Sequence, residues 1–240
     1  RGIQLIEDCS QAHGALYHGE KVGTFGALGC FSTMFSKLHA TGGCGGLVFT
    51  KSEELYWRVR AAADRGRDFE AEDFNPKDAS RCLFPALNLN LDELSCAIGR
   101  STLRKVEGTI SRRLEITSQI NQGIAGLNTV YAVEYPNDAR PSPFFHTIGV
   151  NLETCLVSKI EFAEAVAAEG VGINPDYRYL VADWPWLLEH RPDDNDTPIA
   201  RRFRDTTFNV LFHERYSDND VADLISAIQK VDRILGMPRA

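Results

Sequence analysis

Apolar and polar positions in the first part of the chain follow two patterns in turn. Short apolar runs at Ile3–Glu7, Ala27–Ser32 and Leu47–Thr50 predict three short strands, the first of which is followed by Asp8. From Lys51 to Gly66, Leu55, Val59 and Ala62 recur at helical spacing, so this stretch predicts a helix. Ser52 is its expected N-cap and Gly66 its expected end.

The remaining pattern is mostly helical at first and mixed afterwards. A long helix is predicted from about Asp92 to Ala125, with Gly126 ending it. The elements predicted after it are a strand at 144–152, a helix at 158–169 ended by Gly170, a loop at 183–197, a strand at 206–213 and a helix at 217–235. The change in the pattern of predicted elements after the long helix predicts two domains, residues 1–118 and residues 119–240.

Charge and composition narrow the classes of function. The 240 residues carry a net charge of −7, which disfavours a general basic surface for nucleic acid. There is no apolar run of the roughly 18 residues that cross a bilayer, and the first residues lack the order of a signal peptide. None of the six cysteines forms a CxxC pair, so no metal site is predicted. We therefore expect a cytoplasmic protein that binds neither nucleic acid nor membrane.

Three residues with suitable chemistry lie within forty positions of one another. Asp8 and Ser32 each end a predicted strand, and Lys37 precedes a glycine-rich loop. Ligands of α/β proteins bind where strands end. An amine, a carboxylate and a hydroxyl are the groups that pyridoxal phosphate (PLP) needs from a protein. Residue types alone also allow the simpler interpretation of a turn and a solvated surface lysine.

A longer motif favours the PLP interpretation. The run IEDCSQAHGALYHGEKVGTFGALGCFSTMFSKLHATGGCGG resembles the DegT/DnrJ/EryC1/StrS, or sugar-nucleotide, aminotransferase family. Members show ED-x-x-Q-A-x-G, K-x-G-x-x-G, F-S-x-x-x-x-K and a glycine-rich loop, and all four stand here in this order. The resemblance implies an α/β protein of the PLP-dependent transferase fold type I (aspartate aminotransferase-like). These residues would form part of its large domain, followed by a C-terminal α+β domain.

The resemblance also implies an activity and a set of cofactor ligands. An amino group would pass from glutamate or glutamine to a keto sugar, nucleotide-linked, with a keto-cyclitol as another acceptor. Asp8 would pair with the pyridine nitrogen, Gln11 would lie against the ring, Ser32 would bind the phosphate, and Lys37 would form the Schiff base. Asn88, in ALNLNLDELSCAIGR, would reach the phosphate of the neighbouring subunit's cofactor, which implies a homodimer with shared active sites.

The sequence departs from the family pattern in the regions expected to meet substrate. Asn90 stands where the family has Arg, and Asn209–His213 replaces its L-P-x-H segment. Tyr177 and Arg178 occupy the family's substrate loop and are candidate substrate ligands. His146 matches a family histidine and is a third candidate, with a structural role equally open.

Three further expectations stay open. A related sugar 3-dehydrase would carry His at the Schiff-base position, which is Lys37 here. His39 is expected to be a loop residue near the site with a structural role, and His13 to be either structural or near the cofactor ring. The family's upstream phosphate loop and stacking aromatic are not visible, which would leave sheet edges uncovered. The chain could then be a fragment, could need a second chain, or could be a non-catalytic truncated homologue.

Overall fold

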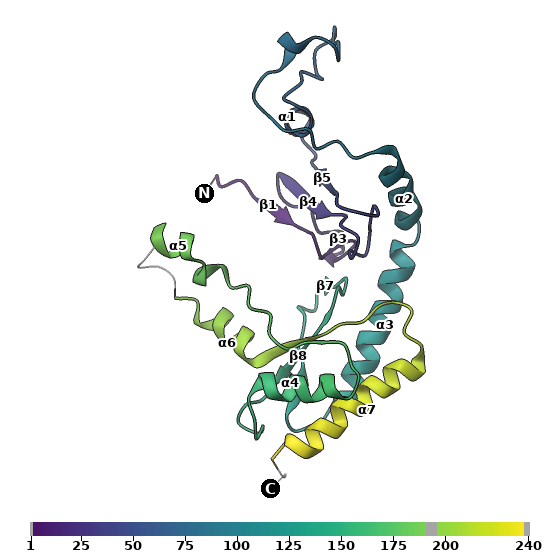
Figure 1. Ribbon diagram of the computed structural model, residues 1–240, viewed down its shortest axis with the longest axis vertical. Helices are drawn as coiled ribbons and strands as arrows, with labels where there is room; N and C mark the ends of the chain where they lie inside the picture. The colour runs from purple at the N-terminus through teal and green to yellow at the C-terminus, as the bar shows by residue number, and fades with distance from the viewer. Residues whose placement is uncertain (1, 191–195, 238–240) are drawn as a thin grey trace. The chain divides into compact units, whose positions relative to one another are not determined.

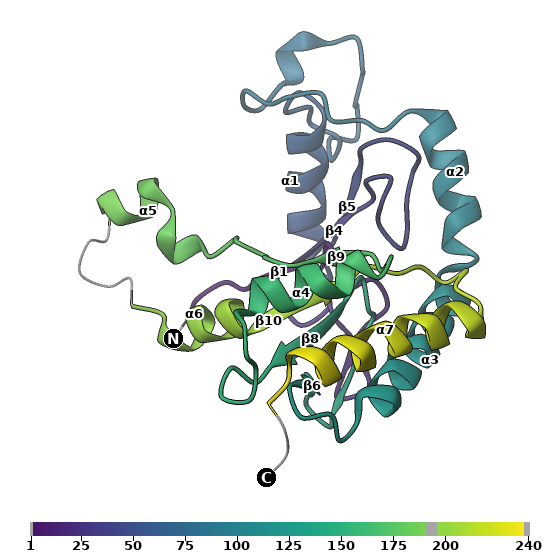
Figure 2. The same ribbon diagram turned by 60° about the horizontal axis from the view of Figure 1, so that its bottom comes forward.

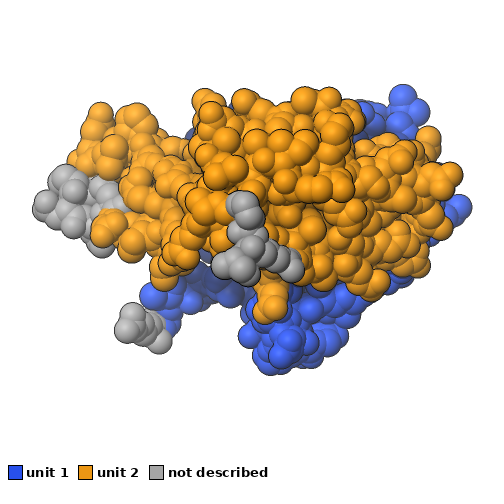
Figure 3. Space-filling model, turned by 90° about the horizontal axis from the view of Figure 1, so that it is seen from below, with its two compact units in different colours: residues 1–111, 135–144 blue, residues 112–134, 145–240 orange. Residues whose placement is uncertain are grey.

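The computed structural model describes residues 2–190 and 196–237, and the chain divides into two compact units. Unit 1 comprises residues 1–111 and 135–144, and unit 2 comprises residues 112–134 and 145–240. Figure 3 shows the two units in different colours. The chain passes into unit 2 within a helix and returns to unit 1 for one short segment before leaving it again. The predicted boundary at 118/119 lies in that same helix.

Unit 1 is built mainly from short strands and three helical segments (Figure 1). Its elements are β1 (Ile6–Asp8), β2 (Leu16–Tyr17), β3 (Glu20–Lys21), β4 (Leu28–Ser32), β5 (Gly46–Phe49), α1 (Glu53–Ala63), the 3-10 helix η1 (Ala79–Arg81), α2 (Glu93–Leu103) and β7 (Ala139–Arg140). Helix α3 (Val106–Ile124) begins in unit 1 and continues into unit 2.

The three predicted strands form one sheet in the order β1-β4-β5. β1 and β4 are parallel, with Asp8 opposite Cys30, and β4 and β5 are antiparallel. All four residues of β5 are exposed, including Leu47 and Val48, so this strand lacks the apolar cover that a buried strand has. A second small sheet, β3-β2-β7, joins the returning segment to the residues that follow β1.

The helix predicted from Asp92 to Ala125 is two helices, and this prediction was wrong in its continuity. α2 ends at Leu103 and α3 begins at Val106. Thr102 explains the break, because its hydroxyl donates to the carbonyls of Gly99 and Ala40. A hydroxyl bonded back to its own helix bends the helix, and here a loop residue shares the same hydroxyl.

Unit 2 contains a four-stranded antiparallel sheet of order β6-β8-β10-β9. Its elements are β6 (Val130–Ala132), β8 (His146–Val150), α4 (Lys159–Ala168), β9 (Ile173–Asn174), the 3-10 helix η2 (Val181–Asp183), α5 (Pro185–His190), α6 (Pro198–Thr206), β10 (Thr207–Val210) and α7 (Asp218–Leu235). The predicted loop at 183–197 contains α5, which the sequence missed; residues 191–195 lie outside the described residues. Pro185 at its first position is pre-organised for a helix start.

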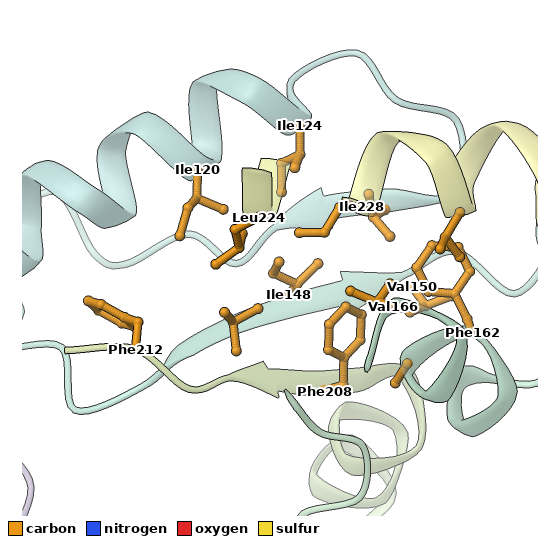
Figure 4. Packing of buried hydrophobic residues seen from close by; sticks show 14 of the residues in the cluster. Ile120, Ile124, Ile148, Val150, Phe162, Val166, Phe208, Phe212, Leu224 and Ile228 are labelled. Carbon is orange, nitrogen blue, oxygen red and sulfur yellow. The ribbon is translucent and has the colours of Figure 1, made fainter. Parts of the chain in front are cut away.

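One face of this sheet is covered by α4, α7 and the second part of α3, as Figures 1 and 2 show. In Figure 4 Ile148 of β8 and Phe208 of β10 lie among Leu224 and Ile228 of α7 and Phe162 of α4. All five side chains are at most 2% exposed. At about 1.5–3 kcal/mol for each fully buried large apolar side chain, this cluster is a substantial core.

Two helices of unit 2, α4 and α7, begin and end close to where the sequence predicted. Ser158 and Ser217 each accept a hydrogen bond in a capping box, from Glu161 and Asp220 respectively. Gly170 follows α4 with φ +93°, the left-handed conformation that glycine adopts without strain. Within the described residues, no helix has the length and apolar character needed to cross a membrane.

Candidate active site

Two of the predicted site residues share one edge of the sheet in unit 1. Asp8 is the last residue of β1 and Ser32 the last of β4, and these strands are parallel neighbours. Ser10 hydrogen-bonds the Asp8 carboxylate, its backbone N–H lying 3.0 Å from Oδ1. The side chain and backbone of Ser10 lower the pKa of Asp8, and the positive charge of Lys37 lowers it further. Asp8 is therefore an ionised carboxylate at neutral pH.

A closely hydrogen-bonded loop carries Lys37. The Thr33 N–H donates to the Gly45 carbonyl at 2.8 Å, which closes the loop at its base. The Lys37 N–H donates to Met34 at 2.9 Å and makes a turn just before the lysine side chain. A Cβ at Gly45 would lie 2.7 Å or less from the hydroxyls of Thr33 and Thr41, so only glycine fits there. The predicted glycine-rich loop thus fixes the position of Lys37 relative to β4.

Lys37 also contacts a residue that the sequence did not single out. Its Nζ lies 4.8 Å from the ring centre of Phe144, at the end of the segment that returns to unit 1. Lys37 and Phe144 are both half-buried. No local spacing relates these two positions, so the sequence carried no signal for the contact.

Two histidines are buried close to Lys37 and Ser32. His13 and His39 are 5% and 4% exposed, and their ring centres are 6.1 Å apart. Burial lowers the pKa of both imidazoles, so both are neutral at physiological pH. His39 Nδ1 lies 3.0 Å from the Thr102 hydroxyl. Neither ring nitrogen of His13 has a hydrogen-bond partner of ordinary length among the described residues. The Ser32 backbone and the charge of Lys37 lie close enough to affect the pKa of His13.

Gln11 and Asn88, the other predicted cofactor ligands, are exposed in unit 1. Gln11 lies in the loop after β1, and Asn88 pairs by a bridge with Asp64, the residue that ends α1. Asn90, which replaces the family's Arg, hydrogen-bonds the Asp64 carboxylate with its side chain. Asn90 therefore helps to hold the Asn88 segment against α1.

In unit 2, Tyr177 lines a cavity of about 740 Å³. Its ring centre lies 5.9 Å from that of Phe145 and 5.4 Å from that of Tyr179. The polar part of the wall includes Thr147, whose hydroxyl donates to Asn209 at 2.9 Å. Most of the wall is apolar or aromatic, with a few polar groups that could orient a ligand.

The other two candidate substrate residues of unit 2 lie in different surroundings. Arg178 is 81% exposed, and its Nε donates to Asp176 at 2.7 Å. His146 is 3% exposed and lies 2.8 Å from Asn121 Oδ1 of α3. Because side chains alternate along β8, His146 faces the core while Thr147 faces the cavity. Burial lowers the pKa of His146 to about 4.

The residues of unit 1 fit the chemical requirements of PLP. An ionised carboxylate, a hydroxyl and a half-buried amine come from Asp8, Ser32 and Lys37, which the ends of two strands and one loop bring to one region. The orphaned nitrogens of His13 add buried polar groups in the same region. Buried polar atoms without a partner are rare in folded proteins, so a polar group of a ligand could supply the missing partner of His13.

A comparison that covers most of the chain agrees with this chemistry. The model of the DegT/DnrJ/EryC1/StrS aminotransferase family matches residues 1–229. The chain belongs to this family.

Two solved structures show that this family member has the family's fold, as the sequence predicted. An aminotransferase from Psychrobacter cryohalolentis superimposes with a TM-score of 0.83 at 22% identity, over 97% of this chain and 62% of that one. A candidate sugar aminotransferase from Streptococcus pneumoniae, in its PLP form, gives 0.81 at 18% identity, over 97% and 58%. The α/β fold of PLP-dependent transferases of fold type I is thereby confirmed.

A curated relative gives a closer sequence match to this family member. The L-glutamine:2-deoxy-scyllo-inosose aminotransferase of Streptoalloteichus tenebrarius is 29% identical over 277 residues, covering 100% of this chain and 61% of the relative. The chain thus spans about three fifths of the length of the relatives that it matches.

Proposed function

We propose that the chain forms part of a PLP-dependent aminotransferase that moves an amino group from glutamine or glutamate to a keto sugar. The observation that carries the proposal is the meeting of Lys37 with the ends of β1 and β4. There the lysine charge acts on the Asp8 carboxylate, and Ser32 ends the neighbouring strand. Membership of an aminotransferase family over residues 1–229 supports it.

Each residue has a definite task in this proposal. PLP supplies an electron sink that stabilises negative charge at the substrate carbon. Asp8, held ionised by Ser10 and Lys37, keeps the pyridine nitrogen protonated. Ser32 binds the phosphate with its hydroxyl, and Gln11 lies against the ring. The Lys37 amine holds the cofactor and then carries a proton to and from the substrate carbon.

The acceptor is the finer part of the proposal. We propose a nucleotide-linked keto sugar, in line with the family resemblance. A keto-cyclitol is the second candidate, because the Streptoalloteichus relative is named for 2-deoxy-scyllo-inosose and for L-glutamine as donor. Tyr177, which lines the cavity of unit 2, and Arg178 stay candidate substrate residues. His146, the third candidate, is buried against Asn121, which favours the structural role that the sequence left open. Amine transfer to each acceptor class, with glutamine and with glutamate, would distinguish them.

Assembly and location are also proposals. The exposed strand β5 and the longer relatives suggest that catalysis needs polypeptide beyond these 240 residues. We propose a cytoplasmic homodimer in which Asn88 reaches the neighbouring subunit's cofactor. Light scattering of a longer polypeptide, with and without PLP, would test the dimer. Asn88→Ala should weaken PLP binding without changing the fold.

The central test is a PLP chromophore that depends on Lys37. The chain is combined with polypeptide covering the rest of the relatives' length, and PLP is added. We expect visible absorbance that borohydride removes, with the label on the peptide containing Lys37. Lys37→Ala should abolish it, whereas Lys77→Ala, at an exposed position of unit 1, should not.

Other outcomes would point elsewhere. No Lys37-dependent absorbance in the combined protein would contradict the proposal and favour a non-catalytic homologue. Absorbance with loss of a sugar hydroxyl, but no transfer of nitrogen, would indicate the 3-dehydrase reaction. Product analysis by mass spectrometry separates the two reactions.

A further inference from the structure

Phe144 is carried by a segment that several contacts fix within unit 1. β7 pairs with β2, with Arg140 opposite Leu16. Arg140 donates to the Glu107 carboxylate at 2.7 Å, and Asp138 lies 2.9 Å from His18 Nε2. The returning segment is therefore attached to the rest of unit 1 at residues 138–140, just before Phe144.

The ring of Phe144 is placed to hold the Lys37 amine. The distance of 4.8 Å from Nζ to the ring centre is inside the limit of about 6 Å for a cation–π contact. Lys37 is half-buried, which reduces the competition of water for its ammonium group. The negative face of the ring attracts the charged amine and restricts its four-carbon stem.

Two further groups lie within electrostatic range of the Lys37 amine. The Lys37 charge acts on Asp8, the last residue of β1, and on His13, in the loop that follows β1. An amine anchored by Phe144 thus stays in the region where β1 and β4 end. Without an anchor, a flexible lysine side chain would sample many rotamers, because its ordering costs up to about 2 kcal/mol of conformational entropy.

We propose that Phe144 is a positioning residue for Lys37, holding the ammonium group by a cation–π contact on the side where β1 and β4 end. The catalytic meaning of this contact rests on the function proposed for Lys37. The contact itself does not, and it is measurable without cofactor.

The test is the rate at which Lys37 is acetylated in the cofactor-free chain. The protein is treated briefly with an acetylating reagent, and peptide mass spectrometry follows the modification of Lys37. Phe144→Leu should raise the rate about 2- to 30-fold, the range expected from a cation–π contact. Phe144→Trp, which keeps an aromatic face, should keep the slow rate.

Fluorination separates the electrostatic effect from packing. Replacing Phe144 by mono-, di- and trifluorinated phenylalanine weakens the negative ring face with little change in size. The acetylation rate should rise with each added fluorine. Phe35→Leu is the matched control, because Phe35 is 71% exposed on the same loop and its loss should leave the rate unchanged.

Three results would overturn the proposal. These are an unchanged rate in Phe144→Leu, equal rates in the Leu and Trp variants, or no trend with fluorination. Circular dichroism confirms that each variant is folded before its rate is compared.

The functional consequence is measured separately. When the chain is combined with polypeptide covering the rest of the relatives' length, Phe144→Leu should weaken PLP binding several-fold. Phe144→Trp should bind PLP about as well as the wild type. If PLP does not bind at all, the proposed function fails while the acetylation result stands. If PLP binds equally to all variants, the positioning role fails while the proposed function stands.

Discussion

At the scale of single residues, ionisation depends on local hydrogen bonds and burial rather than on residue type. Asp8 and His146 show the two directions. Asp8 is exposed, and hydrogen bonds from Ser10 keep it charged. His146 is buried in the core of unit 2 and stays neutral. The charged carboxylate of Asp8 suits a cofactor ligand. The neutral imidazole of His146 predicts that the stability of unit 2 depends on pH.

Asp8→Asn should leave the protein folded but slow amine transfer. The substitution keeps the size of the side chain and removes the charge that would hold a proton on the pyridine nitrogen. We expect a loss of about 100-fold or more in kcat, as for removal of one strong electrostatic contact. Steady-state kinetics of the combined protein measure it, with Glu20→Gln, an exposed position of unit 1, as control. An unchanged kcat would contradict the role of Asp8.

His146 should make unit 2 less stable in mild acid. Its pKa is near 4 in the folded state and near 6.5 when unfolded, so the unfolded chain binds the extra proton between these values. The stabilisation is complete above about pH 6.5 and is lost as the pH falls toward 4, by roughly 3 kcal/mol at most.

Urea unfolding between pH 7 and pH 4.5, followed by a probe in unit 2, measures this effect. His146→Gln should show a shallower dependence on pH than the wild type. His190→Gln, at an exposed position, should keep the wild-type slope. Equal slopes for wild type and His146→Gln would show that His146 takes up its proton in the folded state.

At the scale of elements, the packing of α3 against α7 depends on a close contact that the sequence of either helix alone does not predict. Gly123 lies in the last turn of α3. A Cβ at Gly123 would lie 2.5 Å from Ile225 of α7, and the Gly123 carbonyl accepts a hydrogen bond from the Gln229 side chain at 2.8 Å. Gly123 therefore allows α3 and α7 to pack closely.

Two glycine substitutions in α3 should have opposite effects. Gly123→Ala should lower the free energy of unfolding by about 1–2 kcal/mol, because the methyl group must displace Ile225. Gly108→Ala meets open space and should raise it by about 0.5–1 kcal/mol through the better helix propensity of alanine. Urea unfolding of both variants tests the pair. A higher free energy of unfolding for Gly123→Ala would contradict this prediction and would show that Ile225 of α7 can move aside without loss of stability.

The strands and caps were predictable because their signals are local. β1, β4 and β5 coincide with the three short apolar runs, and Ser52 and Ser217 cap their helices as expected. The break between α2 and α3 was not predictable, because the Thr102 hydroxyl donates a hydrogen bond to Ala40, which lies in a loop far away in the sequence. The helix α5 was missed because an aromatic, proline-containing stretch also fits a loop.

At the scale of the whole molecule, the two units differ in how well each encloses apolar groups. The buried cluster of Ile148, Phe162, Phe208 and the residues around them belongs to unit 2. In unit 1, Leu47 of β5 is 50% exposed. The free energy of local opening follows the number of buried apolar contacts, so the units should differ in stability.

Hydrogen exchange of the chain alone should show this difference. Amides of β8, β10 and α7 should exchange slowly, and amides of β5 and α1 should exchange much faster. Combination with polypeptide covering the rest of the relatives' length should slow exchange in β5. Peptide-resolved mass spectrometry measures both states. Equal protection of the two units in the isolated chain would contradict the expectation.

The sequence by itself determined the family, the strands that end in Asp8 and Ser32, and the lysine that follows them. These features depend on residues close together in the chain, where spacing and residue type suffice. The tertiary structure decided that residues 135–144 return to unit 1, that Phe144 lies over Lys37, and that His146 faces the core. Such contacts join residues far apart in the chain, and packing of the complete units selects them, because no local pattern distinguishes one distant partner from another.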